Sequence, residues 1–389
     1  MKKKIGILGS TGSIGMTTLK LMNTNNFEIY FLTANTNFRK ILNQAKTFKV
    51  KNIIIFDYDS FKKSQLINKN KNINIYNDFN FLKKNLKKKL DYVISSISGI
   101  NGLMPTYNII KYTKKIGIAN KESLICAWPI IYKELIKNKT EFIPVDSEHF
   151  SIWTEIKNIS PKRIKKIYLT ASGGPLLNLK KFFLNKVDIK TILKHPTWKM
   201  GKKISVDSAT MMNKCFEVME AKNIFNLDYN KIDIIIHPKS YIHAIVVYQN
   251  GIIKVIIHDT TMKIPIFNSI HSNNEIYTKA KNLNLDIMNH LDLQKITSNK
   301  FPITSVLKNI PNKHSMFETV LVTINDCVVD KFLKGKISFK KISSLVLKFI
   351  NHNNLNKYKK TFPKNIQQII SLNNEIDKKF SKIIDEKFK

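Results

Sequence analysis

The sequence predicts an α/β protein that begins with a doubly wound, Rossmann-like parallel sheet. Strand-like apolar runs alternate with helical stretches over residues 1–146, and such alternation is typical of a parallel sheet. A glycine-rich turn, GSTGSIG, follows the first apolar run directly. Further along, the pattern changes twice. It predicts a central α+β domain with a mostly antiparallel sheet and then a C-terminal helical domain.

Apolar runs give the expected elements in chain order. N-terminal strands are expected over residues 3–9, 27–34, 50–57 and 90–98, with a helical stretch over 16–23. Central strands are expected over 165–172, 231–238 and 241–259, and the last range contains Asn250-Gly251, a strong hairpin signal. Helical spacing follows over 317–333 and 341–353. We therefore divide the chain into residues 1–146, 147–272, a linker over 273–300, and 301–389.

The composition narrows the class of protein. Of the 389 residues 43% are hydrophobic, and no apolar run approaches the ~20 residues that cross a bilayer, so we expect a soluble protein. The net charge of +37 comes from lysines interleaved with asparagine and isoleucine along the whole chain, which we interpret as nonspecific basicity and not as a nucleic-acid site. Glycines interrupt the first apolar run, which argues against a signal peptide. Three distant cysteines without a C-x-x-C pair favour a reducing, cytoplasmic location.

The glycine turn predicts a dinucleotide site. Gly9, Gly12 and Gly15 stand between the first predicted strand and helix, where the backbone can approach a pyrophosphate at a helix N-terminus. The spacing departs from G-x-G-x-x-G, and a plain tight turn is the alternative. The second predicted strand ends in residues 34–37, with Arg39 and Lys40 just beyond. No acid there would repel a 2′-phosphate, which favours NADP(H).

Residues 143–153, IPVDSEHFSIW, bring two acids together. If the strand pattern continues through them, Asp146 and Glu148 point to the same side. Two carboxylates on one face repel each other unless a proton, a cation or water separates them.

Residues 205–221 predict a polar helix face beside methionines. Asp207 or Ser208 can cap the helix, and Asn213, Lys214 and Glu217 then fall at i, i+1 and i+4. A solvated charged stripe is the alternative. If Glu217 reaches Asp146 and Glu148, three hard oxygen ligands suit Mg²⁺ or Mn²⁺ better than zinc.

Three further segments have the composition of site loops. Lys121 follows an apolar run, where the carboxyl edge of the sheet would lie. Ser172 precedes two glycines in a turn that suits a phosphate. His195 and Trp198 lie in a loop near 194–201, bounded by proline and glycine, that is a candidate lid. The alternatives are a solvated loop for Lys121, a plain sharp turn for Ser172, and a structural or merely exposed histidine for His195.

Six motifs occur in order: GSTGSIG, ANKESL, PVDSEH, SGGP, HPTWKMG and KISVDSATMMNK. Together they resemble the 1-deoxy-D-xylulose 5-phosphate reductoisomerase family. The resemblance implies a cytoplasmic homodimer that converts this sugar phosphate to 2-C-methyl-D-erythritol 4-phosphate in the non-mevalonate isoprenoid pathway. It implies an oxidoreductase and isomerase that uses NADPH, with a retro-aldol and aldol rearrangement followed by hydride reduction. Residues 1–146 would bind NADPH, and 147–272 would carry catalysis and dimerisation.

The resemblance also assigns roles to individual residues. The metal ligands would be Asp146, Glu148 and Glu217, holding Mg²⁺, Mn²⁺ or Co²⁺, and Lys121 would join them as the catalytic set. Substrate contacts would be Lys121, Ser147, Glu148, Ser172, His195, Ser208, Asn213, Lys214 and Glu217. Cofactor contacts would be Thr11, Gly12, Ser13, Ile14, Asn35, Thr36, Asn37, Asn120, Glu122 and Gly201.

The chain departs from the family pattern at two places near these residues. Asn35-Thr36 stands where the family usually has Gly-Lys, and Cys215 replaces a glycine. Two rival interpretations stay open. One is a basic binding protein that kept the scaffold and lost catalysis. The other is a metal-independent semialdehyde-type dehydrogenase, which requires a nucleophilic cysteine; Cys126 lacks the expected surroundings.

Overall fold

The computed structural model describes residues 2–22, 26–179, 184, 187–198, 200–271 and 282–387. The chain forms two compact units. The first unit comprises Met1–Ser123, Ile131–Phe150 and Met262–Ala280. The second comprises Leu124–Ile130, Ser151–Thr261 and Lys281–Lys389. Residues 273–281 of the predicted linker lie outside the described residues.

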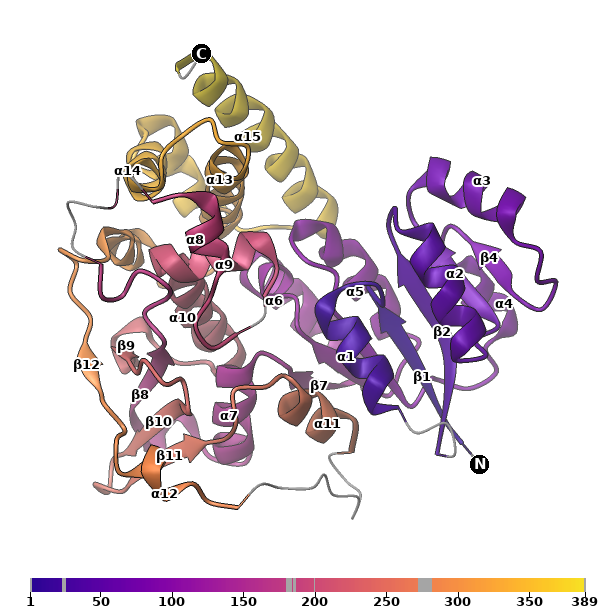
Figure 1. The fold of residues 1–389 in the computed structure, drawn as a ribbon, viewed down its shortest axis with the longest axis horizontal. Coiled ribbons are helices and arrows are strands. Elements are labelled where there is room, and N and C mark those ends of the chain that lie inside the picture. Colours follow the sequence, from indigo (N-terminus) through magenta and orange to yellow (C-terminus); the bar gives the residue numbers. More distant parts are fainter. Residues whose placement is uncertain are drawn as a thin grey trace. The chain divides into compact units, whose positions relative to one another are not determined.

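The first unit is built on a seven-stranded sheet in which every pairing is parallel, as predicted (Figure 1). Its strand order is β4-β3-β2-β1-β5-β6-β7. The strands are β1 Lys3–Leu8, β2 Phe27–Ala34, β3 Asn52–Ile55, β4 Asn74–Tyr76, β5 Tyr92–Ser95, β6 Lys115–Ile118 and β7 Glu141–Pro144. The order reverses beside β1, and this switch point is where open α/β sheets bind ligands.

Helices connect the strands of the first unit. They are α1 Ser13–Leu21, α2 Phe38–Thr47, α3 Tyr58–Ile67, α4 Asn80–Asn85, α5 Leu103–Ile110 and α6 Lys121–Lys137, with a short 3₁₀ turn over Ile100–Gly102. Helix α11 Lys263–His271, from later in the chain, packs against α1 of the same unit. Ile5, Ile7, Leu32 and Ile53 are fully buried in the core of this unit. A parallel sheet covered on both faces requires such near-continuous apolar strands, which made them visible in the sequence.

The second unit contains a five-stranded sheet of order β11-β10-β8-β9-β12. The strands are β8 Ile164–Ala171, β9 Ile232–Ile236, β10 Ile242–Tyr248, β11 Ile253–Ile257 and β12 Gln294–Lys295. Only β8 and β9 pair in parallel, so the prediction of a mostly antiparallel sheet is confirmed. The predicted hairpin joins β10 to β11, and Gly251 adopts a φ of 85° in its turn.

The remaining helices complete the second unit. They are α7 Ser147–Ile156, which begins in the first unit, α8 Ile189–Leu193, α9 Lys202–Thr210, α10 Met212–Phe225, α12 Leu285–Met288, α13 Phe317–Leu333, α14 Phe339–Ile350 and α15 Ile366–Lys387. Among the described residues, 3₁₀ turns also cover Pro161–Arg163, Tyr229–Lys231, Pro302–Asn309 and Asn353–Lys359. Helix α13 packs against α14 and α15, as expected of a C-terminal helical region (Figure 1). Among the described residues, no helix combines the length and apolar character needed to cross a membrane.

Candidate active site

The glycine turn after β1 leaves the N-terminus of α1 open to an anion. Gly9 has a φ of +78°, and a Cβ atom at Gly15 would lie 2.4 Å from the Gly9 carbonyl oxygen, so both positions require glycine. Gly12 is the N-cap of α1 and makes no side-chain cap hydrogen bond. Thr11, Ser13 and Ile14 share this turn. The arrangement fits a dinucleotide pyrophosphate.

The end of β2 lies beside this turn. Residues 35–37 follow the strand and are exposed, and the first turn of α2 contains no acidic residue. The Asn37 side chain accepts a hydrogen bond from the Lys40 backbone N–H at 3.3 Å and caps α2. Lys40 Nζ donates to the Thr11 carbonyl oxygen at 2.9 Å. The two segments predicted to hold the cofactor are therefore joined directly.

Asn120 fixes the carboxyl edge of the sheet at β6. Its amide nitrogen donates to the carbonyl oxygens of Ile97 and Gly99, the latter at 2.8 Å. Its Oδ1 accepts from the Ser123 backbone N–H at 2.7 Å and caps α6. Glu122 Oε2 lies 3.5 Å from the Asn120 amide nitrogen. The buried Asn120 side chain thus joins the loop after β5 to the start of α6.

The strand interpretation of Asp146 and Glu148 is wrong. β7 ends at Pro144, and α7 begins at Ser147. The Asp146 carbonyl accepts from the Phe150 N–H at 2.7 Å, and its Oδ1 accepts from the Glu148 N–H at 3.3 Å, as an N-cap residue does. The carboxylates of Asp146 and Glu148 nevertheless lie within 4.8 Å of each other, because a cap and the first helical turn are adjacent.

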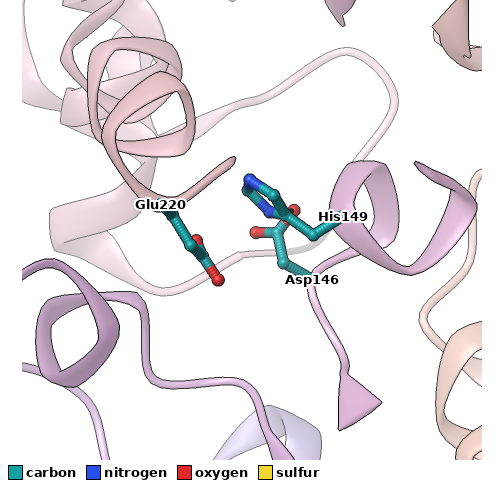
Figure 2. A group of neighbouring side chains, drawn as sticks. All are labelled: Asp146, His149 and Glu220. Atoms are coloured by element: carbon teal, nitrogen blue, oxygen red, sulfur yellow. Dashed lines mark ion pairs between the residues drawn. The ribbon is translucent and has the colours of Figure 1, made fainter. Parts of the chain in front are cut away.

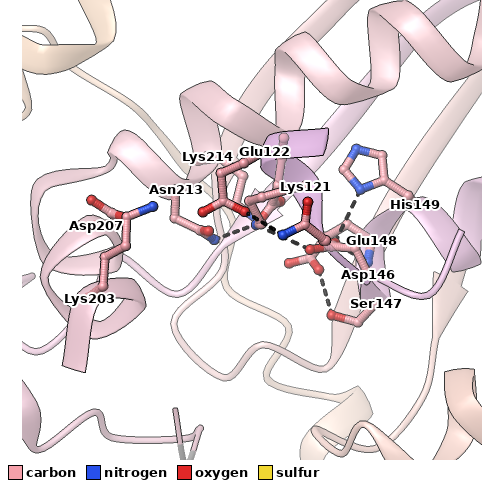
Figure 3. Close-up of polar contacts among 12 residues, drawn as sticks. Lys121, Glu122, Asp146, Ser147, Glu148, His149, Lys203, Asp207, Asn213 and Lys214 are labelled. Carbon is pink, nitrogen blue, oxygen red and sulfur yellow. Dashed lines mark hydrogen bonds and ion pairs between the residues drawn. The ribbon is translucent and has the colours of Figure 1, made fainter. Parts of the chain in front are cut away.

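Cationic and polar groups of the first unit surround Asp146. His149 Nδ1 lies 3.2 Å from Asp146 Oδ1 (Figures 2 and 3). Lys121 Nζ lies 3.2 Å from Asp146 Oδ2 (Figure 3). Ser147 Oγ donates to Glu148 Oε2 at 2.5 Å (Figure 3). His149 is fully buried and was not predicted as a site residue, although its place three residues after Asp146 on a helix start was readable from the sequence.

The predicted cap in residues 205–221 is also wrong. Asp207 and Ser208 lie inside α9, whose N-cap is Gly201. α9 and α10 are separate helices because Met211 adopts the left-handed conformation between them, with a φ of 76°. No sequence signal marks this break, since a methionine rarely takes that conformation.

The predicted polar face of α10 is confirmed. Asn213 Nδ2 donates to Glu217 Oε1 at 2.5 Å, and Lys214 Nζ pairs with Glu217 Oε2. Asn213 and Lys214 are labelled in Figure 3. Lys214 and Glu217 are both buried. Burial raises the pKa of the neighbouring Cys215 thiol, which keeps it protonated. Glu220, labelled in Figure 2, lies three positions after Glu217 on α10, is also buried, and was not predicted.

Ser172 and His195 form a pair beside α9. His195 Nδ1 accepts from the backbone N–H groups of Thr197 and Trp198 at 3.2 and 3.0 Å, so the proton of the neutral ring is on Nε2. Nε2 therefore donates to Ser172 Oγ at 3.1 Å. Burial lowers the pKa of His195 to about 4, which keeps the ring neutral at physiological pH.

The SGGP turn packs directly on α9. Gly174 has a φ of +68°, and a Cβ atom there would lie 2.9 Å from Ala209 Cα and 3.1 Å from the Ser208 carbonyl oxygen. Only glycine allows this approach, which sets the Ser172 turn against the helix that carries Ser208. Ser172 Oγ also accepts from the Gly174 N–H at 3.1 Å. Neither bond to Ser172 uses its hydroxyl hydrogen.

The loop after His195 rests on two stacked histidines. The Trp198 ring lies edge-on to the His243 ring, with 6.1 Å between the ring centroids. The His243 ring stacks on that of His258, with 3.6 Å between the centroids. Lys199, within the predicted lid, lies outside the described residues.

Three family models match successive parts of the chain. Residues 5–128 match the 1-deoxy-D-xylulose 5-phosphate reductoisomerase family, residues 142–225 match its C-terminal domain, and residues 258–379 match the DXP reductoisomerase C-terminal domain. The reductoisomerase of Pelagibacter ubique is 49% identical over 97% of this chain and 99% of its own length. The reductoisomerase of a Thermoanaerobacter species is 36% identical over 98% of this chain and 99% of its own length.

Solved structures agree with these relatives. The Zymomonas mobilis reductoisomerase in complex with NADPH has a TM-score of 0.85 at 28% identity, with 99% of both chains covered. A DOX-P reductoisomerase in complex with NADPH, fosmidomycin and magnesium has a TM-score of 0.88 at 28% identity, with 99% of this chain and 98% of that chain covered. The chain belongs to the 1-deoxy-D-xylulose 5-phosphate reductoisomerase family.

Proposed function

We propose that this protein converts 1-deoxy-D-xylulose 5-phosphate to 2-C-methyl-D-erythritol 4-phosphate, using NADPH and a divalent cation. The observation that carries the proposal is the Asp146–Glu148 pair at the start of α7, whose carboxylates lie within 4.8 Å of each other in a chain of this family. NADPH and magnesium are both bound in a related enzyme. The semialdehyde-type alternative loses support because Cys126 is fully buried.

Asp146, Glu148 and Glu217 are the metal ligands in this proposal. Their donors are carboxylate oxygens, the ligand type that Mg²⁺ and Mn²⁺ prefer. The near approach of two of them favours a cation, because like charges at this spacing repel each other. When bound, the metal supplies Lewis-acid polarisation of substrate oxygens. Lys121 is held beside Asp146 and is the cation of this group that contacts the substrate.

The phosphate of the substrate is bound by Ser172, Ser208, Asn213 and Lys214 in this proposal. The hydroxyl hydrogen of Ser172 is available to a phosphate oxygen because His195 and Gly174 both donate to its Oγ. Ser147 and His195 complete the substrate contacts. The Trp198 loop would close over the substrate and exclude water.

NADPH binds along the glycine turn in this proposal. The open N-terminus of α1 and the glycines at positions 9 and 15 support a pyrophosphate there. The pyrophosphate contacts are Thr11, Gly12, Ser13 and Ile14, and the further cofactor contacts are Asn35, Thr36, Asn37, Asn120, Glu122 and Gly201. Residues 1–146 thus bind the cofactor, and 147–272 carry catalysis.

We also propose a cytoplasmic homodimer. The edge strand β11 supports a second copy as partner, because Ile253 and Val255 are 60% and 45% exposed on it. The buried thiols Cys126, Cys215 and Cys327 agree with a reducing compartment.

A coupled assay tests the function. Purified protein is expected to oxidise NADPH only when both 1-deoxy-D-xylulose 5-phosphate and Mg²⁺ or Mn²⁺ are present, and EDTA is expected to stop the reaction. Glu217→Gln should abolish turnover and metal binding, whereas Glu375→Gln, an exposed acid on α15, serves as the matched control. NADPH oxidation that is indifferent to EDTA and to Glu217→Gln would exclude the metal-dependent reaction.

A further inference from the structure

A lysine of α2 is attached to the glycine turn. Lys40 Nζ donates to the Thr11 carbonyl oxygen at 2.9 Å, across 29 positions of sequence. Lys40 is partly buried, whereas its neighbour Arg39 is exposed. Successive helical residues point about 100° apart, so only one of the two adjacent cations faces the turn. The structure selects Lys40 for that position.

The surroundings of Lys40 suit an anion. An ammonium group has three N–H donors, and the bond to Thr11 uses one of them. The end of β2 and the first turn of α2 contain no acidic residue, so no carboxylate there competes for the lysine. In dinucleotide-binding sheets the adenine ribose lies between the first glycine turn and the end of the second strand. Lys40 joins these two segments.

We propose that Lys40 binds the 2′-phosphate of NADPH and is the residue that selects NADPH over NADH. The inference rests on the proposed cofactor site and names the group within it that reads the phosphate. Asn35, Thr36 and Asn37 carry no charge, so the discrimination at this edge of the sheet falls to a cation on α2. The Thr11 carbonyl holds the ammonium before the cofactor arrives, and less side-chain entropy is lost on binding.

Binding of two small probes tests the inference without substrate or metal. The probes are 2′,5′-ADP, which carries the 2′-phosphate, and 5′-ADP, which lacks it; calorimetry gives both dissociation constants. Lys40→Met is expected to raise the dissociation constant of 2′,5′-ADP about tenfold or more, the effect typical of a lost charged hydrogen bond. The dissociation constant of 5′-ADP should change by less than about twofold. Lys40→Arg should keep most of the preference. Arg39→Met, one position away and exposed, is the matched control and should leave both probes nearly unchanged.

Two results would overturn the inference. If Lys40→Met lowers the affinity for both probes equally, the lysine only supports the turn. If Arg39→Met, but not Lys40→Met, selectively lowers the affinity for 2′,5′-ADP, the phosphate is bound by Arg39. Turnover of the wild-type protein is measured separately. Failure of the proposed reaction therefore appears as lost turnover, and failure of this inference appears as an unchanged ratio of the two probe affinities.

Discussion

Glu318 is expected to make the second unit less stable as the pH rises from about 5 to 8. It lies in the first turn of α13 and is 1% exposed. Burial raises its pKa from 4.5 to about 7, against the opposing effects of the hydrogen bonds from Ser315 and the ammonium of Lys222. His314 faces it, with Nδ1 3.7 Å from Glu318 Oε1, while His314 Nε2 lies 3.1 Å from the Cys126 carbonyl oxygen. Burial therefore favours the protonated, neutral form of the Glu318 side chain.

The sign and size of the effect follow from the two pKa values. Because the folded state keeps this proton to about pH 7 and the unfolded state loses it near 4.5, the folded state binds more protons between these values, and stability falls as pH rises through them. Moving the pKa from 4.5 to about 7 corresponds to about 3 kcal/mol. Glu318→Gln mimics the protonated acid and removes this dependence.

Thermal unfolding at pH 5 and pH 8 measures the effect. The wild-type protein and Glu318→Gln should unfold at similar temperatures at pH 5, and at pH 8 the variant should be more stable by roughly 6 °C, at about 2 °C per kcal/mol for a unit of this size. Burial lowers the pKa of the neighbouring His314 to about 4, so its ring is neutral in the folded state at both pH values and its contribution cancels in the comparison. Glu375→Gln, an exposed acid of the same unit, is the control. The reasoning is refuted if the difference between wild type and Glu318→Gln is the same at both pH values.

Three further outcomes are expected. Gly15→Ala puts a Cβ atom 2.4 Å from a backbone carbonyl of the glycine turn and should both lower the unfolding temperature and weaken NADPH binding at least tenfold in a fluorescence titration. Gly201→Ala, with open space around the Cβ position, is the control for the unfolding temperature and should leave it unchanged. Nitrogen-15 NMR of His195 should show a neutral ring protonated on Nε2 down to about pH 4; a titration near 6.5 would contradict this. Lys214→Met should destabilise the fold by about 3–5 kcal/mol in denaturant titrations, because the buried Glu217 carboxylate would lose the ammonium group beside it, and a loss below about 1 kcal/mol would contradict this.

Helices and strands whose apolar residues are continuous or regularly spaced were predictable from the sequence. β2 and α13 occupy the predicted ranges, because a strand buried on both faces and a long buried helix leave continuous or regularly spaced apolar residues. The Asn250-Gly251 turn was equally readable, because the hairpin requires a positive φ that glycine provides.

Helix starts inside polar motifs were harder to predict. In residues 143–153 the apolar side chains fit both a strand and a helix over so short a window, and Asp146 was better interpreted as a cap. Asp207 and Ser208 resemble caps, yet they lie in the middle of α9. Their true role depends on the left-handed Met211, which only tertiary packing imposes.

The carboxylates proposed as ligands show why part of the site could not be predicted from spacing. The sequence raised the question of what offsets the repulsion between Asp146 and Glu148, and a lysine is one answer: Lys121 pairs with Asp146, as Lys214 pairs with Glu217 within its own unit. Lys121 is 25 positions from Asp146 in the chain, so only the sheet edge brings them together. In each cluster the lysine ammonium offsets part of the negative charge of the carboxylate. A divalent ion bound there would therefore have to displace a lysine ammonium from each carboxylate.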